Sequence, residues 1–162
     1  MDPVKPKLTL LLCAASLAFA AGCSKNYIPN TDVEETEFNR KVVEFVEEYR
    51  RAVERRNIAM LLKLAHPSYY EDGGNIDTSD DLDFAGLKTY LEDKFRDVHA
   101  IRYEIRYRDV STGRNDHIFV DFTYSASYKL PTPNGDVWRR RVADNRIELI
   151  PEKESFRIVS GM

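Results

Sequence analysis

The chain has 162 residues, a length that suits one domain of ordinary size. Hydrophobic residues make up 43% of it and charged residues 31%, so a packed core is expected and global disorder is not. The formal net charge is -3, from 24 Lys+Arg and 27 Asp+Glu, which argues against a dedicated nucleic-acid-binding protein because such proteins are clearly basic. The 2 cysteines are too few for a disulfide scaffold.

The first residues have the pattern of an export signal. Two lysines are followed by the apolar run Leu8–Ala21, which is shorter than the about 20 apolar residues of a membrane span. The run ends in Ala20-Ala21-Gly22-Cys23, which resembles the lipobox of bacterial lipoproteins. This resemblance implies a signal peptide over 1–22, a lipidated cysteine with a tether over 23–35, and a folded domain over 36–162.

Cys23 decides between two kinds of export. By the resemblance, a lipid on Cys23 anchors the protein in the membrane, and Ser24 in place of Asp indicates the outer membrane facing the periplasm. The alternative is ordinary secretion with cleavage after Ala18-Phe19-Ala20. That alternative leaves Cys23 as an unpaired exported thiol, so we favour the lipoprotein.

Residues 33–56 are predicted to form one long helix. Its apolar side chains recur at spacings of three and four and therefore share one face. Thr31 or Asp32 can cap its first turn with a side-chain oxygen. The apolar face consists of Phe38, Val42, Phe45, Val46, Tyr49 and Val53.

Three shorter elements are predicted next. Asn57 can cap a helix over 58–65. Residues 68–71 suit a short strand, the acidic segment 71–83 is a loop, and a third helix starts after Asp83.

From residue 99 the hydrophobic period changes to two, which is typical of strands with one buried face. Asn134-Gly135 suits a hairpin turn. The order of elements, ααβαββββ, predicts an α+β fold with helices on one face of an antiparallel sheet. The predicted long strands cover 101–108, 117–128, 137–150 and 155–160.

The strand over 137–150 has an irregular pattern. Trp138 and Val142 fall on the opposite parity from Ile147 and Leu149. A β-bulge near 143–146 would bring these apolar residues to one face.

This order of elements resembles the nuclear-transport-factor-2-like superfamily, which also holds ketosteroid isomerases and polyketide-cyclase-like proteins. The resemblance is carried by the long first helix, by ERRNIAMLLKLAHPSYYEDGG and by the closing WRRRVADNRIELIPEKESFRIVSGM. It implies a cone, in which a curved antiparallel sheet of four to five strands wraps the first helix and leaves a pocket at its open end. One scaffold of this kind hosts enzymes, binding proteins and assembly subunits.

The resemblance supplies one catalytic hypothesis. In ketosteroid isomerases an Asp base works opposite a Tyr and a protonated Asp that stabilise an enolate. Tyr49 aligns with the oxyanion Tyr and Asp72 with the base, while Asp121 and Asp144 are both candidates for the buried acid. The alternative interpretation makes Tyr49 a core residue and Asp72 a turn residue, and we favour a non-catalytic domain.

A second hypothesis is binding without chemistry, because aromatic side chains with polar tips suit pockets and interfaces. Such a pocket would take a small apolar ligand. The pocket candidates are Tyr49, Tyr70, Asp72, Tyr103, Tyr124 and Trp138.

A run of arginines on neighbouring strands indicates a second surface. It could meet an acidic envelope protein or anionic lipid headgroups, or pair with Glu104 and Asp136. The family resemblance also implies a homodimer through the outer sheet face, or a place in an envelope complex. The arginines are Arg102, Arg106, Arg108, Arg139, Arg140 and Arg141.

Neither a metal nor a cofactor is expected. His66, His99 and His117 share no ligand spacing, and the acidic run from Asp77 to Asp83 lacks the glycine of an EF-hand loop. The sequence therefore predicts a cell-envelope lipoprotein with a non-catalytic ligand- or protein-binding cone domain. The alternative is a proton-transfer enzyme.

Overall fold

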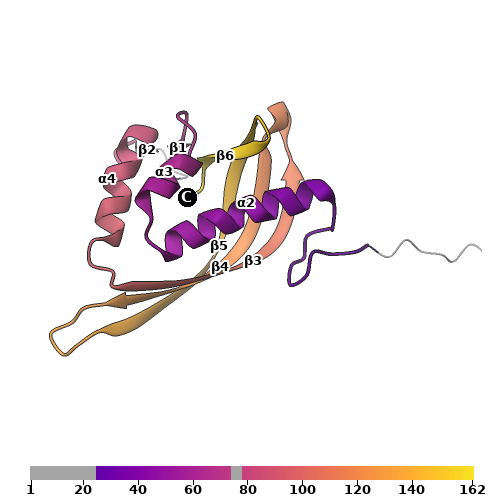
Figure 1. Cartoon of the computed structure of the whole chain (residues 1–162). Helices are drawn as coiled ribbons and strands as arrows, with labels where there is room; N and C mark the ends of the chain where they lie inside the picture. The colour runs from indigo at the N-terminus through magenta and orange to yellow at the C-terminus, as the bar shows by residue number, and fades with distance from the viewer. Residues whose placement is uncertain (1–24, 74–77) are drawn as a thin grey trace, which may run out of the picture.

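The computed structural model describes residues 25–73 and 78–162 (Figure 1). The predicted signal over 1–22 and the lipidation of Cys23 lie outside the described residues. The elements are α2 (Glu37–Glu54), α3 (Ile58–Leu64), β1 (Tyr70–Glu71), β2 (Leu82–Asp83), α4 (Phe84–Phe95), β3 (Ala100–Thr112), a 3-10 turn (Arg114–Asp116), β4 (Ile118–Leu130), β5 (Val137–Glu152) and β6 (Ser155–Ser160).

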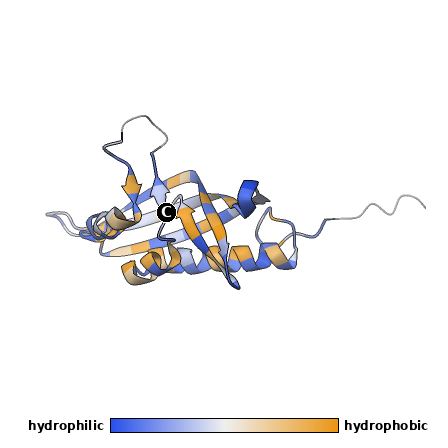
Figure 2. Ribbon diagram, turned by 90° about the horizontal axis from the view of Figure 1, so that it is seen from above, coloured by the Kyte–Doolittle hydropathy of each residue, from blue (hydrophilic) through white to orange (hydrophobic). Residues whose placement is uncertain are grey.

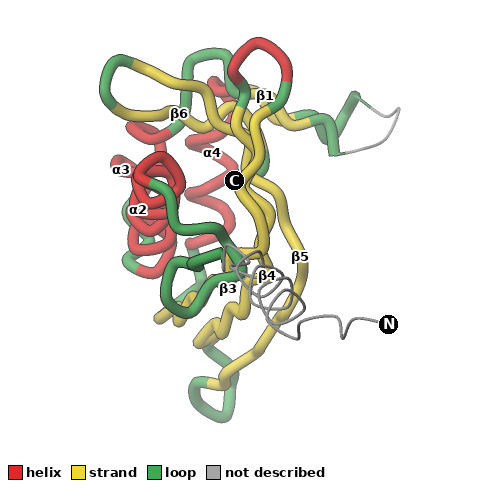
Figure 3. Tube along the Cα trace, turned by 90° about the vertical axis from the view of Figure 1, so that its right-hand side faces the viewer, coloured by secondary structure: helices red, strands yellow, loops and turns green. Residues whose placement is uncertain are grey.

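The four long strands form one antiparallel sheet in the order β3-β4-β5-β6, and β1 pairs with β2 in a separate two-stranded sheet. The helices lie on one side of the large sheet (Figure 3). In Figure 2 apolar and polar segments alternate along helices and strands, as expected for elements with one buried face. The predicted α+β fold is confirmed.

The helix α2 begins later than predicted. Thr36 is its N-cap and accepts a hydrogen bond from the backbone N–H of Asn39 at 3.0 Å. The expected caps, Thr31 and Asp32, are used elsewhere: the Thr31 hydroxyl donates to the carbonyl of Ile28 at 2.8 Å. The start predicted at residue 33 is therefore wrong, because a polar turn intervenes.

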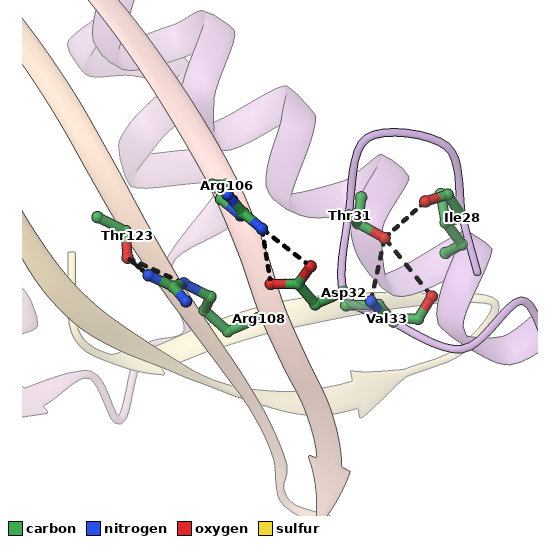
Figure 4. Close-up of polar contacts among 7 residues, drawn as sticks. All are labelled: Ile28, Thr31, Asp32, Val33, Arg106, Arg108 and Thr123. Carbon is green, nitrogen blue, oxygen red and sulfur yellow. Dashed lines mark hydrogen bonds and ion pairs between the residues drawn. The ribbon is translucent and has the colours of Figure 1, made fainter.

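Residues 25–35 fold into a loop against the edge of β3 (Figure 4). The backbone N–H of Asp32 donates to the carbonyl of Tyr107 at 3.0 Å, and the Asp32 carboxylate pairs with Arg106 at 3.1 Å. Val33 is 1% exposed and belongs to the core. The described part of the predicted tether is thus packed on the domain.

The hydrophobic core lies between α2 and the inner face of the sheet. It takes Val42 and Val46 from α2, and Val120, Phe122 and Ile147 from the central strands. All of its buried members lie between Val33 and Ile158. The segment 25–162 therefore contains all of the core that the structure describes and is expected to fold by itself.

The bulge predicted near 143–146 is absent from the pairing of β4 with β5. The register runs unbroken from Ile118↔Leu149 to Leu130↔Val137. Trp138 and Val142 therefore stay on the outer face of the sheet, 43% and 56% exposed. The prediction was wrong because β5 continues past the core, where its inner positions need no apolar side chain. The predicted Asn134-Gly135 turn is confirmed, with backbone hydrogen bonds between Thr132 and Gly135.

The two edges of the sheet contact other parts of the chain. On β3, the N–H of Tyr103 donates to Glu54 Oε1 at 3.4 Å, and its carbonyl accepts from Arg50 Nη1 at 3.0 Å. On β6, the carbonyl of Ile158 accepts from the N–H of His66 at 2.8 Å.

Candidate functional site

Tyrosine side chains fill the interior of the cone. Tyr49 on α2 and Tyr103 on β3 are each 5% exposed. Their rings meet edge to face with centroids 6.4 Å apart, and Tyr103 stacks on Tyr124 at 5.5 Å. Two predicted pocket residues, Tyr103 and Tyr124, therefore join Tyr49 in a packed cluster.

Burial keeps these phenols neutral. It raises the pKa of Tyr49 and Tyr103 well above the ordinary value, and it raises the pKa of Tyr69 to about 12. Among the residues that the structure describes, no Asp, Glu or His side chain is buried with them. The carboxylate that meets a buried tyrosine in the described interior is that of Glu47, which is only partly buried and accepts from the Tyr107 hydroxyl at 2.8 Å.

The residues proposed for proton transfer lie elsewhere. Asp72 is exposed just after β1, and Tyr70 is 51% exposed with its hydroxyl bonded to Asp81. Asp121 and Asp144 both lie on the outer face of the sheet: Asp121 pairs with Arg146, and Asp144 accepts from Thr123 at 2.6 Å. None of these carboxylates lies in the tyrosine cluster.

Asp72 and Tyr70 line a polar groove of about 400 Å³ beside β6. Glu148 accepts from the Ser160 hydroxyl at 3.1 Å and also contacts His117 Nδ1. The register of β4, β5 and β6 brings these residues together from distant places in the sequence, so spacing alone could not reveal the groove. Within the described ranges, no group of three or more His, Cys, Asp or Glu side chains could hold a metal ion.

The outer face of the sheet is the opposite side of β3, β4 and β5, away from the helices (Figure 3). Arg146 makes two hydrogen bonds to Asp121, at 2.7 and 2.8 Å, which hold the pKa of that carboxyl below its usual range. Arg108 donates to Thr123 at 2.9 Å, as Figure 4 shows. An open depression of about 640 Å³ lies here, lined by Arg108, Asp121, Phe122, Asp144, Asn145 and Arg146. The outer face, as we use the term, consists of the outward-pointing residues Arg106, Arg108, Asp121, Thr123, Val142, Asp144 and Arg146.

Trp138 also lies on the outer side and not in the cone. The guanidinium carbon of Arg102 lies 4.6 Å from the centre of its ring. The predicted strip of arginines is divided by strand alternation: Arg140 shares the side of Trp138, whereas Arg139 and Arg141 point to the other side.

A further cavity lies on the helix side of the sheet. It has a volume of about 350 Å³, lies between α2, α3 and the β5–β6 hairpin and is lined in part by Phe45, Met60 and Phe156. The groove, the depression and this cavity are not lined by Tyr49, Tyr103, Tyr124 or Trp138. No helix in the described part of the chain has the length and apolar character needed to cross a membrane.

No protein-family model and no curated protein matches this chain. Solved structures do match. Kfla4162 from Kribbella flavida has a TM-score of 0.63 at 12% identity, over 76% of this chain and 86% of that one. A candidate calcium/calmodulin-dependent protein kinase II association domain from Xanthomonas campestris has a TM-score of 0.61 at 16% identity, over 85% and 91%.

A candidate dehydratase of the NTF2-like family from Streptomyces avermitilis has a TM-score of 0.60 at 12% identity, over 76% of this chain and 92% of that one. Identities this low show the fold alone. Together with the element order, they establish the NTF2-like cone fold that the sequence predicted.

Proposed function

We propose that this protein is a lipid-anchored, non-catalytic binding module of the bacterial cell envelope that holds a partner protein on the outer face of its sheet. One observation carries the proposal: the sheet has a filled side and an open side. Tyr49 and Tyr103 are buried on the filled side, whereas Val142 is 56% exposed on the open side.

The filled side disfavours the enzyme alternative. Proton transfer needs a base within hydrogen-bond reach of the substrate. Asp72 is exposed and lines the groove beside β6, and Tyr49 does not line that groove. We therefore expect Asp72→Asn to restore every phenotype of a deletion strain as fully as the unchanged gene does. Loss of complementation by a normally expressed Asp72→Asn protein would revive the catalytic hypothesis.

The size of the open side favours a protein over a small molecule. β3 and β4 each have 13 residues. At about 3.3 Å per residue and about 4.8 Å between strands, three strands present a face of roughly 43 by 10–14 Å. With its projecting side chains, such a face comes near the about 800 Å² that each partner contributes to a standard interface.

The chemistry of the outer face also suits a protein partner. Arg146 pairs with Asp121 and Arg106 with Asp32, so the outer face presents a mixed polar surface around the exposed Val142. Arg108 and Asp144 both hydrogen-bond to the hydroxyl of Thr123. Protein interfaces combine apolar contacts with a polar surround of this kind.

A photo-crosslinking residue at position 142 tests this proposal in native membranes. Position 90, where Tyr90 is 39% exposed on α4, is the matched control away from the sheet. We expect one adduct of defined mass from position 142 and none from position 90. The adduct should fall at least tenfold when Asp144→Lys reverses an exposed charge on the same face. An adduct of twice the chain's mass would mean that the molecule bound to the outer face is a second copy of this protein. Adducts from position 90 alone would refute the proposal that the outer face binds a partner.

The anchor depends on Cys23. Cys23→Ser is expected to leave an unprocessed form or a soluble periplasmic form, because no thiol remains to carry the lipid. Metabolic labelling with a fatty acid measures this directly. Continued labelling of the Cys23→Ser protein would contradict the lipoprotein assignment.

A further inference from the structure

The β4–β5 hairpin extends the sheet beyond the helices and projects from the domain (Figure 1). We define the arm as residues 127–141 of this hairpin together with Ala100–Glu104 of β3. Strand pairing continues through the arm to Leu130↔Val137, so the arm is an ordered part of the sheet.

The arm concentrates positive charge that the protein itself does not neutralise. Arg102, Arg139, Arg140 and Arg141 are all exposed, and within the described residues none of them forms an ion pair. Arg140 donates only to the Ser125 hydroxyl, at 3.0 Å. Six described arginines outside the arm pair with a carboxylate, namely Arg40, Arg50, Arg96, Arg106, Arg146 and Arg157, whereas the other described arginines outside the arm, such as Arg51 and Arg114, do not.

The charges surround the arm. Side chains alternate along β5, so Arg139 and Arg141 project from one side and Arg140 from the other, where Arg102 also lies. A flat protein surface could engage only one of these sides. A layer of lipid headgroups, which a projecting hairpin can enter, engages both.

Trp138 gives the arm an interfacial residue. It is the only tryptophan in the chain, it is 43% exposed, and its ring lies against Arg102. Tryptophan is enriched where apolar lipid meets water, because its ring is apolar and its N–H is polar. Arginine binds phosphate with two parallel hydrogen bonds.

We propose that the arm binds the surface of a bilayer that contains anionic phospholipid. The guanidinium groups of Arg102 and Arg139–Arg141 bind headgroup phosphates, and Trp138 lies at the headgroup level. The chain as a whole is acidic, but an exposed charge acts only within a Debye length of about 10 Å, so the local charge of the arm governs contact. This contact requires neither the lipid on Cys23 nor a partner on the outer face.

The test uses the segment 25–162, which holds every core residue in the described ranges and lacks Cys23. Vesicles of phosphatidylcholine with about a third phosphatidylglycerol are compared with vesicles of phosphatidylcholine alone. Because Trp138 is the only tryptophan, its emission reports on the arm. We expect sedimentation with the anionic vesicles, a blue shift of the emission, and loss of both at high salt.

Matched variants distinguish binding by the arginines of the arm from an effect of the protein's net charge. Each basic residue near an anionic surface contributes about fivefold to binding, so Arg139→Gln/Arg140→Gln/Arg141→Gln should weaken it roughly 100-fold. The control Arg51→Gln/Arg55→Gln/Arg114→Gln removes the same charge at exposed arginines that lie outside the arm and have no ion pair among the described residues. It should bind as the unchanged segment does.

Three results would overturn the proposal: an equal loss in the control variant, vesicle binding without a change in Trp138 emission, or no preference for anionic vesicles. Circular dichroism of both triple variants verifies that the fold is intact. The segment lacks Cys23, and the variants leave the outer face unchanged. A negative result in the vesicle experiment would therefore not count against the proposed lipid anchor or the proposed protein partner, which are tested separately.

Discussion

Buried tyrosines make the folded state sensitive to alkali. Tyr49, Tyr69, Tyr103 and Tyr107 are each 5% exposed or less, and burial raises the pKa of all four above 10.0. In the unfolded chain the same phenols titrate near 10. The unfolded chain therefore loses protons above pH 10 that the folded chain keeps. The stabilisation is complete below pH 10 and is lost as the pH rises through the folded pKa values.

The expected loss of stability above pH 10 is large. Each such phenol lowers the free energy of unfolding by about 1.4 kcal/mol per pH unit above its unfolded pKa. Four of them together remove about 5 kcal/mol per unit, and for Tyr69 the loss ends near its folded pKa of about 12. Since a domain has about 5–15 kcal/mol of stability in total, we expect cooperative unfolding between about pH 11 and 13.

Urea unfolding at a series of pH values measures this slope, and the absorbance of tyrosinate reports ionisation. Tyr49→Phe should reduce the slope by about a quarter, whereas Tyr27→Phe, at a 52% exposed tyrosine, should leave it unchanged. If the buried tyrosines ionise near pH 10 while the fold persists, the interior is open to water. Our account of a filled cone would then be wrong, and a ligand pocket near Tyr49 would be favoured.

Two further changes probe the packing. Gly161→Ala should lower the free energy of unfolding by at least about 2 kcal/mol, because Gly161 has φ +87° and a Cβ there would lie 2.0 Å from the carbonyl oxygen of Arg146. Gly135 has φ +105° but open space around it. Gly135→Ala should therefore cost only the backbone strain of about 1–2 kcal/mol. Equal losses in urea unfolding would contradict the close approach. Val33→Ala should loosen the loop 25–35 and speed its limited proteolysis, because Val33 is its buried contact; unchanged cleavage would mean that polar contacts alone hold it.

Periodicity predicted the main elements because each has one buried face. The stripe from Val42 to Tyr49 lies in the core, and the alternation in β3 and β4 holds over most of their lengths. The start of α2 was misplaced because Thr31 and Thr36 are both good caps. Two contacts decide between them: the Thr36 side chain accepts from the N–H of Asn39, whereas the Thr31 hydroxyl donates to the carbonyl of Ile28.

The candidate sites depend on register more than on residue type. The sequence could not tell whether Tyr49 was a core residue or an oxyanion donor, because a Tyr on an apolar helix face suits both. The approach of His117 and Ser160 to Glu148 depends on the pairing of β4, β5 and β6, which no spacing encodes. The expected bulge in β5 likewise assumed that every apolar residue faces the core, and Trp138 does not.

The contacts along the two edges of the sheet limit how this protein can assemble. An edge strand with free backbone groups invites another chain to add a strand, which is a route to fibres and to domain swapping. Here Glu54, Arg50 and Asp32 engage backbone groups of β3, and His66 engages β6. Growth by strand addition is blocked at these points. The sheet can bind other molecules through the side chains on its face, while its edges do not readily template aggregation.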